Sequence, residues 1–108
     1  MTNNEFFEIY SAYQHRHMAY GTYYGRTSLL KNNFLPAYGE LTPSDVTYLD
    51  INRIYDDMEN RGLSINTIFG VYAALLSYFK MAVEYSEVDN NPVSFAKPIR
   101  PEISGRNI

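Results

Sequence analysis

The stretch SINTIFGVYAALLSYFKMAVEYSEVDNNP, residues 64–92, decides the fold of this chain. Its apolar side chains recur at steps of three and four residues, which is typical of a helix that buries one side. Ser64 is a preferred N-cap residue and Pro92 cannot continue a helix, so the pattern also predicts both ends. The sequence therefore predicts a long central core helix. Its expected inner stripe comprises Ile65, Ile68, Phe69, Tyr72, Leu75, Leu76, Phe79, Ala82 and Val83.

Small and polar residues follow another side of the same helix. They are Asn66, Gly70, Ala73, Ala74 and Ser77. Small side chains allow either a second helix or a DNA backbone to come close, and the sequence leaves both possibilities open. The first turn, with Ser64, Asn66 and Thr67, combines backbone N–H groups with side-chain donors. Such a helix start suits a bound phosphate.

Two helices are expected before this one in the first third of the chain. The first begins near Thr2 or Asn4, because Thr2 and Glu5 have the spacing of a capping box, and it ends before Gly21. The second runs over residues 22–35, because the proline that follows disfavours a helical conformation at its last residue. No segment shows the sustained alternation of a strand.

A further helix is expected between residues 42 and 62. The segment PAYGEL, residues 36–41, is interpreted as a turn. Thr42 then serves as the helix cap with Pro43 in the first position, and Gly62 followed by an apolar residue suits a left-handed end. The chain is therefore expected to be an all-α domain of four helices.

Composition excludes several classes of protein. A chain of 108 residues is expected to form one domain with one core. It contains no cysteine, which excludes disulfides, thiolate metal sites and cysteine nucleophiles. The longest uninterrupted apolar run is far shorter than a membrane span, so we expect a soluble cytoplasmic protein. With 11 Tyr and 6 Phe the chain is rich in aromatic residues, and tyrosine serves interfaces as well as cores.

The net charge of −3 conceals an uneven distribution of charges. Residues 14–33 hold Arg16, Arg26, Lys31 and two histidines without a carboxylate, whereas residues 40–59 hold six carboxylates and one arginine. Because the local field matters more than net charge for docking a polyanion, one basic face on an acidic domain is possible. Chance clustering of solvated charges is the alternative.

Five short motifs follow one another between residues 22 and 93. They are P-x-x-G at 36–39, L-T-x-x-D-V at 41–46, G-L-S-x-x-T-I at 62–68, F-x-x-A-V at 79–83 and N-P-V at 91–93. Each is unspecific alone, but their order and spacing resemble the N-terminal core-binding domain of tyrosine recombinases, the integrases of phages and transposons.

This resemblance implies a four-helix, SAM-like orthogonal bundle that grips double-stranded DNA at the recombination core site. Residues 1–93 would form the core-binding domain, and residues 94–108 would begin a linker to a catalytic domain of the same parent chain. That second domain would supply the nucleophilic tyrosine and the residues around the scissile phosphate. The fragment itself would carry no catalytic residue, metal or cofactor. It would be monomeric, and its parent would act as a tetramer on DNA.

The charge map and the family geometry together predict which residues contact DNA. The expected phosphate contacts are Arg16, Arg26 and Lys31, with Tyr23, Tyr24 and Thr27 near the groove or sugar edges, and Asn66, Thr67 and either Tyr78 or Lys80 from the central helix. Such contacts position a protein but read little sequence, so weak and strongly salt-dependent binding is expected.

Some of these residues also have a structural interpretation. Packing in an aromatic-rich core would equally account for Tyr23 and Tyr24. Arg53 and Arg61 lie within one helical turn of acidic residues, so we expect them to form ion pairs rather than to bind DNA. His15 and His17 are two positions apart on a helix and face different sides, which disfavours a metal site.

Two other functional classes are alternatives to DNA binding. A small helical protein-interaction domain fits the acidic total charge and the shortage of Lys and Arg. An independent enzyme is disfavoured, because the sequence shows no acid/base pair, glycine-rich phosphate loop or metal-ligand spacing.

Overall fold

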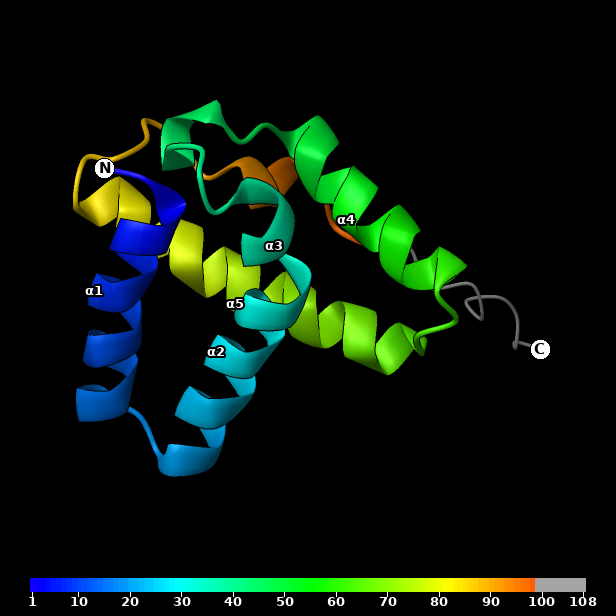
Figure 1. The fold of residues 1–108 in the computed structure, drawn as a ribbon, viewed down its shortest axis with the longest axis horizontal. Coiled ribbons are helices and arrows are strands. Elements are labelled where there is room, and N and C mark those ends of the chain that lie inside the picture. Colours follow the sequence, from blue (N-terminus) through cyan, green and yellow to red (C-terminus); the bar gives the residue numbers. More distant parts are fainter. Residues whose placement is uncertain (99–108) are drawn as a thin grey trace.

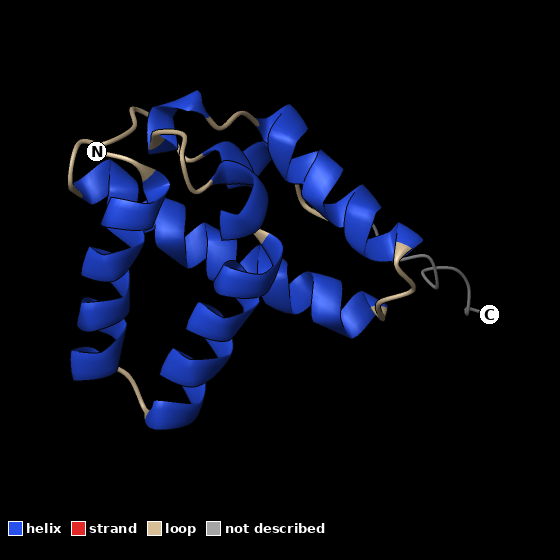
Figure 2. Cartoon of the chain, viewed as in Figure 1, coloured by secondary structure: helices blue, strands red, loops and turns tan. Residues whose placement is uncertain are grey.

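The computed structural model describes residues 1–98, and these residues form helices and loops without any strand (Figure 2). The all-α fold class is therefore confirmed, with five α-helices and two short 3₁₀-helices in this part of the chain. In order they are α1 (Asn3–His17), α2 (Tyr20–Asn33), α3 (Leu35–Tyr38), η1 (Pro43–Asp45), α4 (Tyr48–Asn60), α5 (Ile65–Glu84) and η2 (Pro92–Phe95).

Helix α5 is the element against which the others pack. Helices α1 and α2 form an antiparallel hairpin, blue and cyan in Figure 1, and both contact α5. Helix α4 and η2 contact α5 and each other. The end of the hairpin where α1 joins α2 projects away from α5 (Figure 1). This end is called the hairpin tip below and comprises residues 15–24.

Aromatic rings fill the centre of the core. Phe6, Tyr10, Phe34, Tyr78 and Phe79 are fully buried. The Tyr78 ring meets all four of the others edge to face, with centroids 5.1 to 5.4 Å apart. Such geometry is the preferred one for aromatic pairs and adds about 0.5–1.5 kcal/mol per pair beyond burial.

The predicted inner stripe of α5 is incomplete. Four of its residues, Ile68, Leu75, Phe79 and Ala82, are buried as expected, but Val83 is exposed. Val71, Ala74, Tyr78 and Met81 are buried in addition. Neighbours on several sides bury more than one stripe of a helix, and burial removes Tyr78 from the expected DNA contacts.

Helix α5 is also the only described helix that is long and apolar enough to cross a membrane by length and composition. The sequence predicted no membrane-spanning segment, because its longest uninterrupted apolar run, residues 71–76, is far shorter than a span. The central helix of a folded core has the same composition, and α5 occupies that position here.

The small residues of α5 serve helix packing. A Cβ added to Gly70 would lie 3.2 Å from Cδ1 of Leu29 on α2. The Tyr10 hydroxyl on α1 donates to Oγ of Ser77 at 3.0 Å, and Ala74 is fully buried. Of the two possibilities that the sequence left open, close approach of helices accounts for these three positions.

Helix caps were predicted with mixed success. The capping box of Thr2 and Glu5 is confirmed, with the Thr2 N–H donating to Oε1 of Glu5 at 2.7 Å. The left-handed end at Gly62 is confirmed too, with a φ of 80°. The predicted helix start at Thr42 is wrong, because its box closes only the short turn η1 and a second box at Thr47 and Asp50 starts α4. Between the boxes Val46 is extended and buried, which breaks the helix there.

Helix α2 and the segment after it also differ from the prediction. Helix α2 begins at Tyr20, so Gly21 lies inside it. It ends at Asn33, before the predicted Leu35, and the supposed turn contains the helical residues of α3. Pro36 is compatible with α3 because the first turn of a helix needs no bonded N–H.

Helix α5 ends earlier than expected, and packed residues continue past Val93. Helix α5 stops at Glu84, and Ser86 adopts a φ of 61° just beyond it. Asn91 does not end a helix but caps η2 and donates to the Leu76 carbonyl at 3.1 Å. The expected boundary after Val93 falls inside η2, and Ala96 and Pro98 are buried. The packed unit thus reaches Pro98, and the rest of the expected linker lies outside the described residues.

One buried polar side chain connects three parts of the fold. Asn3 is fully buried, and its amide nitrogen donates to the carbonyls of Tyr38 and Leu41 at 2.9 and 3.0 Å. Its amide oxygen accepts a hydrogen bond from the Tyr78 hydroxyl at 2.8 Å. Asn3 therefore joins the start of α1 to the segment after α3 and to α5.

Replacing Asn3 by Ala is expected to lower the free energy of unfolding by about 2–3 kcal/mol, because buried partners lose their hydrogen bonds. Asn4→Ala, at an exposed neighbour with one long contact to Glu40, should change it by less than about 0.5 kcal/mol. Urea denaturation of both variants measures the difference. Equal losses would show that Asn3 is not the connecting residue described here.

Stability should fall in alkaline solution. Burial raises the pKa of Tyr10, Tyr38, Tyr55 and Tyr78 above the ordinary value of 10.0. Their contribution to stability is present below pH 10 and is lost as the pH rises, because the unfolded chain releases these protons first. The free energy of unfolding should decrease by up to about 1.4 kcal/mol per pH unit for each buried tyrosine. A value from denaturant titrations that stays constant up to about pH 11 would contradict this.

Candidate nucleic-acid interface

Residues 9–39, which cover the second half of α1 and all of α2, carry basic residues and no acidic ones. No carboxylate occurs between Glu8 and Glu40. Arg16 and Lys31 are exposed and form no ion pair within residues 1–98. Lys31 lies 11 positions after Tyr20 on α2, which corresponds to about 16 Å along the helix. The hairpin therefore presents separated, unpaired cations along an exposed edge.

The hairpin tip is also covered by tyrosine rings. Tyr20 and Tyr24 are 70% and 58% exposed, and their rings stack with centroids 5.9 Å apart. Tyr23 is half-buried against His15, at 4.8 Å. Core packing therefore does not account for Tyr24. Sequence reasoning missed Tyr20, although its spacing of three and four residues to Tyr23 and Tyr24 places all three on one side of a helix.

Two of the predicted contact residues have structural roles. Arg26 is on α2 and its side chain reaches α1, where Nη1 donates to Oε1 of the buried Gln14 at 3.0 Å. Thr27 is buried, and its hydroxyl donates to the Tyr23 carbonyl at 2.8 Å. Burial removes Thr27 from the side chains that can reach a partner. Arg26 is half-buried and already engaged, so its prediction as a simple phosphate ligand needs revision.

One edge of α5 borders the hairpin. Asn66, Ala73 and Lys80 are exposed and follow one another at steps of seven residues, so they lie on one side of the helix. Gly70 and Ser77 share this side and contact α2 and α1, respectively. Two of the predicted contact residues, Asn66 and Lys80, therefore lie on the side of α5 that also contacts the hairpin.

The two helix starts on this part of the molecule differ in their caps. At α5 the Ser64 side chain accepts from the Thr67 N–H at 3.2 Å, and the two hydroxyls lie 3.1 Å apart. Thr67 thus has a local partner. Helix α2 starts at the hairpin tip with Ala19 as N-cap, without a side-chain cap and without an acidic residue in its first turn. Its unpaired N–H groups and the positive end of its dipole favour an anion.

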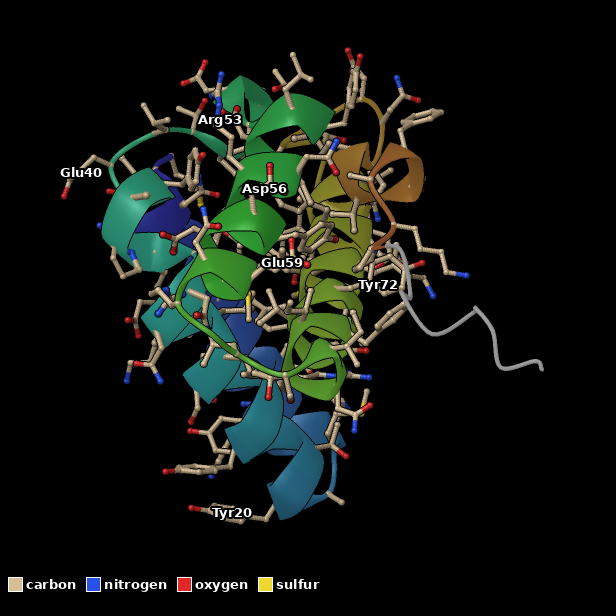
Figure 3. All side chains as sticks on the ribbon, turned by 90° about the vertical axis from the view of Figure 1, so that its right-hand side faces the viewer. Tyr20, Glu40, Arg53, Asp56, Glu59 and Tyr72 are labelled. Atoms are coloured by element: carbon tan, nitrogen blue, oxygen red, sulfur yellow. The ribbon has the colours of Figure 1, made fainter. Side chains whose placement is uncertain are left out.

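Most acidic residues lie away from the hairpin tip, although α1 carries Glu5 and Glu8 in its first half. Figure 3 shows Glu40, Asp56 and Glu59 well away from Tyr20, which marks the hairpin tip. Helix α4 and its C-cap, called the acidic side below, carry two arginines, and both are paired as predicted. Arg53 contacts Asp50 and Arg61 contacts Asp57, both at 3.0 Å. The fold thus separates unpaired cations from most of the carboxylates.

The two histidines do not face each other. His17 packs on Tyr13, with ring centroids 4.3 Å apart, while His15 packs on Tyr23. Within residues 1–98 no group of His, Asp and Glu side chains is placed to hold a metal ion. Both histidines are exposed near the hairpin tip, where a phosphate can approach them.

Replacing Arg26 and replacing the exposed cations should have different effects on the free energy of unfolding. Arg26→Ala is expected to lower the free energy of unfolding by about 1–2 kcal/mol, because the buried Gln14 oxygen loses its donor. Arg16→Ala and Lys31→Ala should change it by less than about 0.5 kcal/mol. Thermal or urea denaturation distinguishes these outcomes, and equal effects of all three would contradict the role assigned to Arg26.

Comparison with known proteins adds no further assignment. No protein-family model matches the chain, and neither the curated proteins nor the solved structures contain a match to it. The functional argument therefore rests on the residues and geometry described above.

Proposed function

We propose that this chain is a DNA-binding module similar to the core-binding domain of a tyrosine recombinase. The hairpin and the bordering edge of α5 contact one side of a duplex. In this proposal the module has no catalytic role and works with a catalytic domain of the same parent chain, which assembles as a tetramer on paired core sites in the cytoplasm. DNA integration and recombination are then the functions of that parent.

One observation carries the proposal. Residues 9–39 carry exposed cations and exposed tyrosines without a carboxylate, on a chain whose net charge is −3. Like-charge repulsion would keep a polyanion from the acidic side, whereas the hairpin offers positive charge that no neighbouring acid neutralises. The uncapped start of α2 adds backbone donors at the tip.

The arrangement of helices is compatible with the finer fold assignment. Helices α1, α2, α4 and α5 are the four long helices of the described residues, and α3 is a single turn between two of them. We propose that these four correspond to the SAM-like orthogonal bundle that the motif order suggests. The motifs at residues 36–46 and 62–68 fall on the connections before α4 and before and into α5, where they shape the turns.

The contacts proposed for DNA form a smaller set than the sequence suggested. Arg16 and Lys31 meet phosphates, Tyr20 and Tyr24 lie against sugars or groove edges, and Asn66 and Lys80 extend the contact along α5. Arg26 positions α1 against α2, and Tyr23 supports the tip through His15. Phosphate contacts dominate this set, so affinity depends more on salt than on sequence.

A protein-interaction domain remains the second candidate, and the hairpin tip is the observation that favours it. Met18, Tyr20 and Tyr24 are exposed there, and Tyr13 is exposed beside it on α1. Tyrosine, methionine and arginine are enriched in protein interfaces. The two candidates use the same surface but differ in salt dependence, since a protein partner held by ring contacts is less sensitive to ionic strength.

A titration with duplex DNA at about 50 mM and about 200 mM salt tests the proposal. We expect weak binding at the lower salt and a slope of log K against log salt near −3, for about three phosphate contacts. Arg16→Ala and Lys31→Ala should each weaken binding and reduce the slope by about 1.

Arg53→Ala is the matched control, because it also removes one cation but lies on α4 and is paired with Asp50. It should leave binding nearly unchanged. Absence of binding at low salt would overturn the proposal. Equal losses for Arg53→Ala and Arg16→Ala would also overturn it, because binding would then follow net charge and not the hairpin.

A further inference from the structure

A pocket lies on the acidic side of the molecule, between α4, α5 and the segment that follows η2. Its volume is about 550 Å³, and it is lined by Asn52, Tyr55, Asp56, Glu59, Ile65, Ile68, Lys97 and Pro98. This volume is in the usual range for sites that bind small molecules or single large side chains. The α4 residues recur at steps of three and four, so one face of α4 forms one wall.

Tyr55 gives this pocket an unsatisfied polar group. The residue is 7% exposed, and its buried hydroxyl has no hydrogen-bond partner among residues 1–98. A buried polar group without a partner costs about 1–3 kcal/mol. Desolvation by burial, with the nearby Tyr72 as a second cause, raises the pKa of Tyr55, so its hydroxyl stays neutral and can accept a hydrogen bond.

The carboxylates of the pocket are unpaired. Asp56 and Glu59 are exposed, and neither carboxylate forms an ion pair or a hydrogen bond within residues 1–98. They follow one another along α4 near its C-terminal end, with α5 beside them in Figure 3. The negative end of the helix dipole lies there, and no basic residue occurs in the last turn of α4. A bound cation would relieve this unfavourable concentration of negative charge.

We propose that this pocket binds an alkylguanidinium group, with the planar cation at Asp56, Glu59 and the Tyr55 hydroxyl. Its apolar stem lies against Ile65 and Ile68. A guanidinium carries five N–H donors in a fixed plane, which allows one group to serve two carboxylates and a hydroxyl together. Lys97 leaves the pocket with one net negative charge, which matches a ligand with one positive charge.

The guanidinium can come from a free small molecule or from an arginine side chain of a peptide. Butylguanidinium, which carries one positive charge, represents the first source, and the capped tripeptide acetyl-Leu-Arg-Leu-amide represents the second. Acetyl-Leu-citrulline-Leu-amide is the neutral control with nearly the same shape. Titration calorimetry gives the affinities, and the methyl NMR signals of Ile65 and Ile68 report on the location.

We expect butylguanidinium or the arginine peptide to bind and to shift both isoleucine signals, and the citrulline peptide to bind at least about tenfold more weakly. Binding of butylguanidinium alone would identify a free cation as the ligand, and preference for the peptide would identify an arginine side chain. Failure of both to bind overturns the proposal. Equal affinity of the arginine and citrulline peptides also overturns it.

Variants test whether the guanidinium binds at the named residues. Glu59→Gln should weaken binding about tenfold, and Tyr55→Phe about fivefold. Asp57→Asn is the matched control, because it removes the same charge from the next face of α4, where Asp57 pairs with Arg61 outside the pocket. Its effect should stay within about twofold. Unchanged affinity in Glu59→Gln, an exposed position whose replacement does not threaten folding, overturns the assignment even if Tyr55→Phe is unstable.

Discussion

The buried side chain of Asn3 is the constraint on which the remaining packing depends. A fully buried amide must find partners for its donors and its acceptor, and here they come from residues 38–41 and from Tyr78 on α5. The backbone reinforces the same contact, since the N–H groups of Asn3 and Asn4 donate to the carbonyls of Leu41 and Gly39 at 2.7 and 2.9 Å. The start of α1 is thereby held against both the α3 connection and the core helix, and the direction of the hairpin follows from this attachment.

The chain passes close to the start of α1 at Gly39, and this close approach explains why the P-x-x-G motif has a glycine there. A Cβ on Gly39 would lie 2.7 Å from the Leu35 carbonyl oxygen and against the Asn4 side chain. Only glycine allows the chain to pass so near to the start of α1. With α1 held in place, α2 runs back beside it. The small residues of α5 allow the hairpin helices to pack closely against α5, which fixes the hairpin on the core. The hairpin tip is then the part of α1 and α2 farthest from this anchor, and it is free to carry exposed rings and charges.

Candidate site residues were predictable from the sequence only as far as charge and spacing reach. The absence of carboxylates between residues 9 and 39 is visible in the sequence, and it singles out the helices that carry the unpaired Arg16 and Lys31. Which cations are free was not visible. Arg26 is held by Gln14, twelve positions earlier, and Thr27 turns inward to its own helix. The Tyr55 pocket had no sequence signal, because its walls come from α4, α5 and residues 97–98, and they meet only when η2 folds back.

The sequence by itself determined the all-α class, the central apolar helix, the capping box at Thr2 and the left-handed end at Gly62. These features depend on interactions within a few residues, so local spacing is sufficient to predict them. The tertiary structure decided which of two competing boxes starts α4, because the burial of Val46 forces an extended residue between them. It also decided which side chains of α5 are buried and where the charges face. Those outcomes depend on contacts between residues far apart in the chain, such as Asn3 with Tyr78, and periodicity along one segment carries no information about them.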